Sequence, residues 1–173
     1  MFQDLIKKRR SIRSYTEEKV SKEDLECLLE AGLSAPSAKN RKPVEYIVIE
    51  DEKMLDHLGK FKKGTAAFIG KAPLAIAILV DKEAAQVTYV QDASIAATFI
   101  QLQATDLGLG SCWANVLGST DPEGRPGEVY IREALGVPEK YSIQAIIAIG
   151  HIDQFPKDLP PFDRKAKIHY EKY

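Results

Sequence analysis

Two apolar runs constrain the fold of this chain more than any other feature. They are "PLAIAILV" at 73–80 and "SIQAIIAIG" at 142–150, and neither contains a charged residue. A strand with one face in water alternates polar and apolar residues, whereas a strand buried on both faces is apolar throughout. The runs therefore predict two central strands of a sheet, each buried on both faces.

Segments with helical periodicity lie around these runs. The stretch 84–106 is apolar around most of its circumference, which predicts a helix in the interior or at a subunit interface. Ser21 and Asp24 form the pattern of a capping box, and the helix that follows has an apolar stripe of Leu25, Leu28, Leu29 and Leu33. Shorter helices are predicted at 2–9 and 129–136, strands at 45–50 and 108–116, and a turn-rich loop at 35–43.

The balance of charge limits the partners of the chain. Its 173 residues include 24 Lys and Arg against 25 Asp and Glu, so its formal net charge is −1. This balance gives no field that would condense the chain on nucleic acid or an anionic membrane. The length fits a single domain over 1–173, and without a leader peptide or a spanning run we expect a cytoplasmic protein. Cys27 and Cys112 are expected to be reduced, buried thiols.

Residues 7–15, "KKRRSIRSY", concentrate positive charge near the start of a chain that is not basic overall. The five cations are Lys7, Lys8, Arg9, Arg10 and Arg13. Guanidinium groups beside a hydroxyl suit a phosphate that is held without a metal, so we expect a small anionic partner. For Lys7 and Lys8, a solvated helix end that complements the helix dipole is the simpler interpretation.

The C-terminal extension, 150–173, has no means of burying itself. It contains prolines and no strong period, yet it carries apolar side chains at Phe155, Phe162, Ile168 and Tyr170. Such a segment is expected to lie along another surface. Together with the apolar helix at 84–106, the extension favours a homodimer in which each chain embraces its partner. The alternative is a monomer in which the helix is central and the extension covers its own chain.

Four motifs follow one another in the order of a known family. They are "RRSIRSY" at 9–15, "APSAKNRKP" at 35–43, "LGLGSCWANV" at 107–116 and "PFDRKAKIHYEKY" at 161–173. In these motifs the chain resembles the compact FMN-dependent nitroreductases over nearly its whole length. The resemblance implies an α+β fold, with a central mixed β-sheet flanked by helices. It also implies an obligate homodimer with an exchanged C-terminal extension and two FMN molecules at the subunit interface.

The resemblance also implies roles for individual residues. Arg9 and Ser11 would serve the phosphate and ribityl end of FMN, and Arg13 would reach the pyrimidine edge of the flavin. The loop at 35–43 would contribute from the other subunit, and the main chain at 113–115 would pass flavin N5. The cofactor-binding candidates are Arg9, Arg10, Ser11, Arg13, Pro36, Ser37, Asn40, Trp113, Ala114, Asn115, Arg164 and Lys165. The chain departs from the family pattern at Lys42 and Val44, which leaves the pocket shape and the preferred acceptor open.

The implied activity is that of an FMN-dependent NAD(P)H oxidoreductase. NADH or NADPH would pass hydride to flavin N5 and leave, and a nitroaromatic, a quinone or a similar acceptor would take its place. This chemistry needs no acid, base or nucleophile from the protein. The three histidines lack metal-ligand spacing, and no nucleophile motif is present. Two alternatives stay open: another chemistry on the same fold, such as dehalogenation, or a flavin-binding sensor or carrier without turnover.

Overall fold

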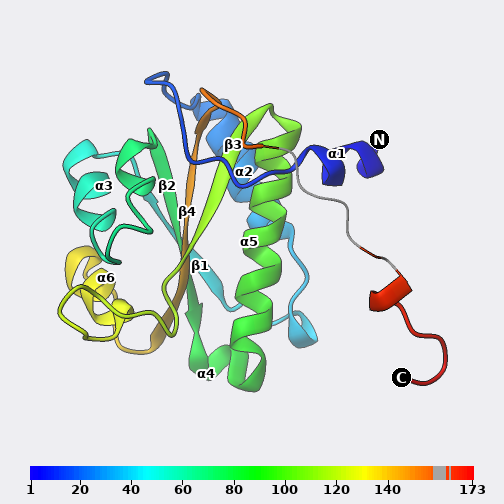
Figure 1. The fold of residues 1–173 in the computed structure, drawn as a ribbon. Helices are drawn as coiled ribbons and strands as arrows, with labels where there is room; N and C mark the ends of the chain where they lie inside the picture. The colour runs from blue at the N-terminus through cyan, green and yellow to red at the C-terminus, as the bar shows by residue number, and fades with distance from the viewer. Residues whose placement is uncertain (158–162, 164) are drawn as a thin grey trace.

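A four-stranded sheet forms the centre of the fold in the computed structural model, which describes residues 1–157, 163 and 165–173 (Figure 1). The strands are β1 (Val44–Ile49), β2 (Leu74–Asp81), β3 (Leu109–Asn115) and β4 (Tyr141–His151), in the spatial order β1-β2-β4-β3. The two apolar runs form β2 and β4, and all but the last residue of each strand is buried. The prediction of two central, doubly buried strands is confirmed.

Each pair of neighbouring strands is antiparallel, whereas the resemblance implied a mixed sheet. The reason lies in the connections. A long helical crossover links β2 to β3, which run in the same direction, but β4 lies between these two strands. Within the described residues, parallel pairing is confined to one bridge, between Ser11 and Ser111. The α+β class is confirmed.

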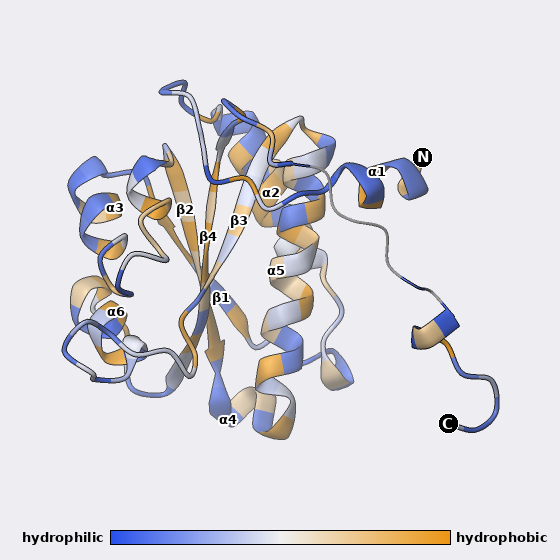
Figure 2. Cartoon of the chain, in the orientation of Figure 1, coloured by the Kyte–Doolittle hydropathy of each residue, from blue (hydrophilic) through white to orange (hydrophobic). Residues whose placement is uncertain are grey.

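Helices cover both faces of the sheet. Helices α2 (Lys22–Ser34) and α5 (Tyr89–Asp106) pack on one face, and α3 (Glu52–Leu58) and α6 (Gly127–Leu135) pack on the other (Figure 1). The side chains of β2 alternate between the two cores, so that isoleucines face α2 and α5 and alanines face α3 and α6. Figure 2 shows hydrophobic residues concentrated in the strands between the two helical layers.

Helix α2 begins as predicted but buries a slightly different face. Ser21 caps the helix, because its hydroxyl accepts a hydrogen bond from the main-chain N–H of Asp24 at 3.0 Å. The buried face ends at Gly32, whereas Leu33, expected in the stripe, is 60% exposed. Gly32 lies against the ring of Tyr46, where an added Cβ would come within 2.8 Å of the phenolic oxygen. Close packing on β1 therefore requires glycine at this position.

The predicted helix at 84–106 is divided into parts. A short helix, α4 (Lys82–Ala85), and a 3-10 turn (Gln86–Thr88) precede α5. Gln86 has a φ of 57°, and a right-handed helix does not continue through that conformation. Helix α5 packs one side on the sheet and leaves Ile95 and Phe99 each 37% exposed. The other described 3-10 turns are Ala38–Asn40, Ile69–Lys71 and Lys165–Lys167.

Helix α1 (Phe2–Lys8) and residues 165–173 extend away from this three-layered body (Figure 1). The two ends of the chain carry exposed apolar side chains, including Phe2, Ile6, Phe155 and Tyr170. Phe162, which was expected to belong to this set, lies outside the described residues. The described chain therefore leaves apolar surface uncovered at both of its ends. None of the described helices is long and apolar enough to cross a membrane.

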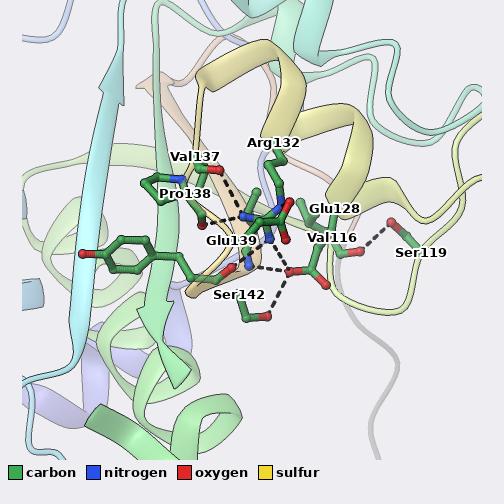
Figure 3. Close-up of polar contacts among 10 residues, drawn as sticks. Val116, Ser119, Glu128, Arg132, Val137, Pro138, Glu139 and Ser142 are labelled. Carbon is green, nitrogen blue, oxygen red and sulfur yellow. Dashed lines mark hydrogen bonds and ion pairs between the residues drawn. The ribbon is translucent and has the colours of Figure 1, made fainter. Parts of the chain in front are cut away.

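A polar network fastens α6 to the start of β4 (Figure 3). Arg132 donates hydrogen bonds to three main-chain carbonyls, those of Val137, Pro138 and Tyr141, at 2.6 to 3.1 Å. Glu128, one turn earlier in α6, accepts hydrogen bonds from the Ser142 hydroxyl and the Ile143 main-chain N–H. Arg132 also lies 3.7 Å from the Glu128 carboxylate. Arg132 and Glu128 thus provide hydrogen-bond partners for polar groups of the connection at 136–143. The layer of α3 and α6 partly covers this connection.

We predict that Arg132→Met lowers the free energy of unfolding by about 2 to 3 kcal/mol, because carbonyls that lie away from water lose a charged donor. Urea denaturation measures the change. The control is Lys53→Met, which removes an exposed helical cation and is expected to change stability by less than about 0.5 kcal/mol. Equal stability of both variants would show that the network does not hold α6 in place.

Candidate functional site

Residues 7–15, the basic segment, lie along the edge strand β3 of the sheet. The main-chain N–H of Ile12 donates to the Ser111 carbonyl on β3 at 3.0 Å. Ile12 is 2% exposed, and its side chain fills the space above Gly110, where any Cβ would come within 2.7 Å of it. Tyr15 secures the far end, because its hydroxyl donates to the Ile12 carbonyl at 2.6 Å. Burial raises the pKa of Tyr15, so its hydroxyl keeps the proton that it donates.

Alternation along this extended segment separates its cations. Residues 9, 11 and 13 share one side, and residues 10 and 12 share the other. Both Arg9 and Arg13 lie close enough to Cys112 to act on its ionisation. Burial raises the pKa of the Cys112 thiol, and the two guanidinium charges oppose that rise without overcoming it. Both guanidinium groups therefore lie in the neighbourhood of Cys112, and Cys112 remains a neutral thiol.

The Arg10 side chain makes its contacts away from Arg9 and Arg13. Its guanidinium donates to the carbonyl of Lys157 at the start of the extension. Arg10 also lines a separate surface hollow with Lys7, Lys8 and the end of α5. The structure therefore does not bring Arg10 together with Arg9 and Arg13, although the three are close in sequence.

Arg13 shares a hollow of ≈ 180 Å³ with the end of β3. The predicted residues Trp113, Ala114 and Asn115 line it, together with Phe61, Lys62, Thr65, Ala66 and Phe68. The Arg13 guanidinium lies 5.8 Å from the centre of the Phe68 ring. The sequence analysis missed the lining segment 61–68. Its signal was weak: two aromatic residues flank a Gly-containing stretch with no helical or strand period.

The main chain of β3 offers donors on the side of Arg13. Because the Ser111 carbonyl accepts from Ile12, the main chain at residue 111 faces the basic segment. Main-chain groups of an antiparallel strand alternate in direction, so residues 113 and 115 also face outward while residue 114 faces β4. Among the three predicted residues, the main-chain N–H groups of Trp113 and Asn115 are therefore those directed away from the sheet.

The loop at 35–43 is fixed at the other end of α5. The buried Asp92, in the first turn of α5, accepts a hydrogen bond from the Ala38 main-chain N–H at 2.9 Å. The Ser37 hydroxyl accepts from the Lys42 main-chain N–H at 2.9 Å. The Lys42 ammonium in turn donates to the carbonyls of Leu33 and Ala35 at the end of α2. Lysine at 42 thus holds the loop to α2.

This loop does not meet the basic segment within one chain. The loop contacts Asp92 in the first turn of α5, whereas Arg10 shares a hollow with Thr105 and Asp106 in the last turn. Thirteen residues of helix separate these two places by about 20 Å. Pro36, Ser37 and Asn40 are therefore far from Arg10 in the described chain, and none of them lines the hollow at Arg13.

The last two cofactor-binding candidates are Arg164 and Lys165, and the two cysteines differ in exposure. Arg164 lies outside the described residues. Lys165 is exposed, and no described hydrogen bond or ion pair joins it to another candidate residue. Cys112 is buried as predicted, but Cys27 is exposed, because it points away from the α2 face that carries Leu28.

We predict that Lys42→Met lowers the free energy of unfolding by about 1 to 2 kcal/mol and speeds amide exchange at 37–42, because two carbonyls lose their donor. Urea denaturation and hydrogen exchange measure these effects. Lys39→Met is the control, since Lys39 is exposed in the same loop and also has a positive φ. If both variants exchange at the wild-type rate, Lys42 does not hold the loop.

The chain is similar to known proteins along almost its entire length. The profile described as "Nitroreductase family" matches residues 6–65 and 52–151. An FMN-dependent nitroreductase from Clostridium difficile R20291 is 44% identical, with a TM-score of 0.92 and 98% of each chain covered. A protein of Archaeoglobus fulgidus, provisionally named NADH dehydrogenase/NAD(P)H nitroreductase, is 37% identical over 98% of this chain and 97% of its own. The FMN reductase [NAD(P)H] of Bacillus subtilis is 28% identical over 95% of this chain and 71% of its own. This chain belongs to the nitroreductase family.

Proposed function

We propose that this protein is an FMN-dependent NAD(P)H oxidoreductase. The observation that carries the proposal is the hollow in which Arg13 meets the outward-facing end of β3. Arg9 and Ser11 lie on the same side of the basic segment as Arg13, as alternation along an extended segment predicts. The names of the relatives described above, which include FMN dependence and NAD(P)H as reductant, support this assignment.

The residues present fit FMN. A phosphate held without a metal needs guanidinium and hydroxyl donors, which Arg9 and Ser11 provide on one side of the basic segment. A planar ring needs apolar walls, and the hollow has Phe61, Phe68 and Trp113. No acidic side chain lines the hollow, so no described group there would repel an anionic cofactor.

When bound, FMN supplies the redox chemistry: it takes a hydride from NAD(P)H and passes electrons to an acceptor. The chain's own contribution is position and charge. Arg13 would place a positive charge near the ring edge on which reduction adds negative charge, and this would favour reduction. The main-chain N–H groups of Trp113 and Asn115 are fixed donors, because β4 holds β3 along its whole length. Cys112 takes no part, since it remains a neutral buried thiol.

We further propose that two copies of the chain form each site. Within the described chain the loop at 35–43 is fixed to the first turn of α5 and none of its residues lines the hollow at Arg13, so a second copy would have to bring Ser37 or Asn40 to the cofactor. Helix α5 exposes Ile95 and Phe99, and α1 and the extension carry further uncovered apolar residues. An obligate interface of about 2,000 Å² or more would bury such surface.

We predict that the protein binds FMN more tightly than riboflavin, because riboflavin has no phosphate. Arg9→Ala should weaken FMN by about 2 kcal/mol, the scale of a lost charge-assisted hydrogen bond in a partly desolvated site, and leave riboflavin unchanged. Flavin fluorescence titration measures both affinities. Lys8→Ala removes a neighbouring exposed cation and should retain FMN affinity. Equal affinity of the wild-type protein for the two flavins would contradict the phosphate assignment.

We predict that Phe99→Glu shifts the protein from dimer to monomer and lowers its FMN content, because a buried carboxylate at the interface is costly. Sedimentation velocity and absorbance measure the two changes, and circular dichroism checks folding. Lys53→Glu is the control, since Lys53 is exposed on α3, which packs on the other face of the sheet. A monomeric wild-type protein with a full complement of FMN would overturn the shared site.

The enzymatic assignment is tested by steady-state oxidation of NADH with and without a quinone. Turnover that depends on both FMN and the quinone supports the oxidoreductase. A protein that binds FMN stoichiometrically and does not turn over with any tested acceptor would be a flavin carrier or sensor.

A further inference from the structure

The hollow beside Arg13 contains a second cation that the proposed function does not use. Lys62 lines it together with Arg13 and Trp113. The side chain is only partly exposed, and the described structure gives it no hydrogen bond or ion pair. A cation that faces a hollow without a partner is available to a ligand.

The segment that carries Lys62 is anchored on both sides. Phe61 is fully buried next to it, and Ala66 and Phe68 are 1% and 7% exposed. These side chains pack in the core between the sheet, α3 and α6. Lys62 therefore has a fixed main-chain position at the hollow. Its neighbour Lys63 is exposed and does not line the hollow.

The hollow selects for a particular kind of ligand. Its walls are aromatic at Phe61, Phe68 and Trp113, its cations are Arg13 and Lys62, and no carboxylate lines it. Arg13 is assigned to the cofactor, which leaves Lys62 for the molecule that reacts beside it. In the proposed function the flavin ring takes these aromatic walls, so an acceptor would stack on the open face of the flavin beside the hollow. A spare cation there suits a planar ring that bears an anionic substituent.

We propose that Lys62 determines acceptor specificity, favouring small aromatic acceptors that carry a carboxylate over neutral ones. This inference rests on the proposed function. The phosphate that distinguishes NADPH from NADH is a second possible anion. It is separated from the nicotinamide by two riboses and a pyrophosphate, so it lies far from a cation beside the reacting ring. A carboxylate attached directly to the reacting ring meets Lys62 instead.

The test uses the full-length, FMN-loaded protein with two matched variants, Lys62→Met and Lys63→Met. Benzoate and benzamide, which differ in charge and are not reduced, are titrated by calorimetry at low salt. The wild-type protein and Lys63→Met should bind benzoate about fivefold more tightly than benzamide, and Lys62→Met should lose the preference. With NADH as reductant, para-nitrobenzoate should show the same loss relative to para-nitrobenzamide, through KM rather than kcat.

Four results would overturn the inference. Three of them are equal binding of benzoate and benzamide by the wild-type protein, an equal loss of preference in Lys63→Met, and a weaker FMN affinity in Lys62→Met with an unchanged acceptor ratio. A lowered NADPH-to-NADH ratio in Lys62→Met, with no change between the two acceptors, would assign the cation to the reductant and also overturn it. Quinone turnover by the same protein separates these failures from failure of the proposed function, since a protein without FMN or turnover fails both.

Discussion

The contact between Ile12 and the edge strand β3 determines where the charged groups of this protein lie. One main-chain hydrogen bond to Ser111 and the packing of Ile12 over Gly110 hold the basic segment along β3. Alternation then places residues 9, 11 and 13 on one side of the segment. A flexible N-terminal arm with the same composition would be a solvated cluster of cations. Held on the sheet, it is one wall of a hollow.

Helix α5 imposes the second constraint. It is long, its first turn holds the loop at 35–43 through Asp92, and its last turn adjoins the basic segment. The loop at 35–43 is thereby kept apart from Arg10, and none of its residues lines the hollow at Arg13. The same helix carries exposed Ile95 and Phe99. The proposed second copy of the chain would both cover this apolar surface and bring the loop to the cofactor.

Prediction from the sequence succeeded where a local pattern has one physical meaning. The apolar runs identified β2 and β4, and Ser21 with Asp24 identified the start of α2. It was wrong where the outcome depends on tertiary contacts. Leu33 fits a helical stripe, but the ring of Tyr46 selects Gly32 for the buried position. The resemblance implied a mixed sheet, but β4 lies between β2 and β3, and each pair of neighbouring strands is antiparallel. For the candidate site, the motifs predicted that Arg13, Trp113 and Asn115 bind the cofactor. They did not predict Lys62, because it belongs to a segment without periodicity and only the fold brings it to the hollow.

The central claim is that this chain positions FMN for reduction by a nicotinamide. Anaerobic titration of the FMN-loaded protein with NADH and NADPH, followed by flavin absorbance, tests it most directly. The account predicts that at least one nicotinamide bleaches the flavin band with one equivalent per FMN, and that an acceptor restores it. A stoichiometric flavoprotein whose absorbance neither nicotinamide changes would contradict the account.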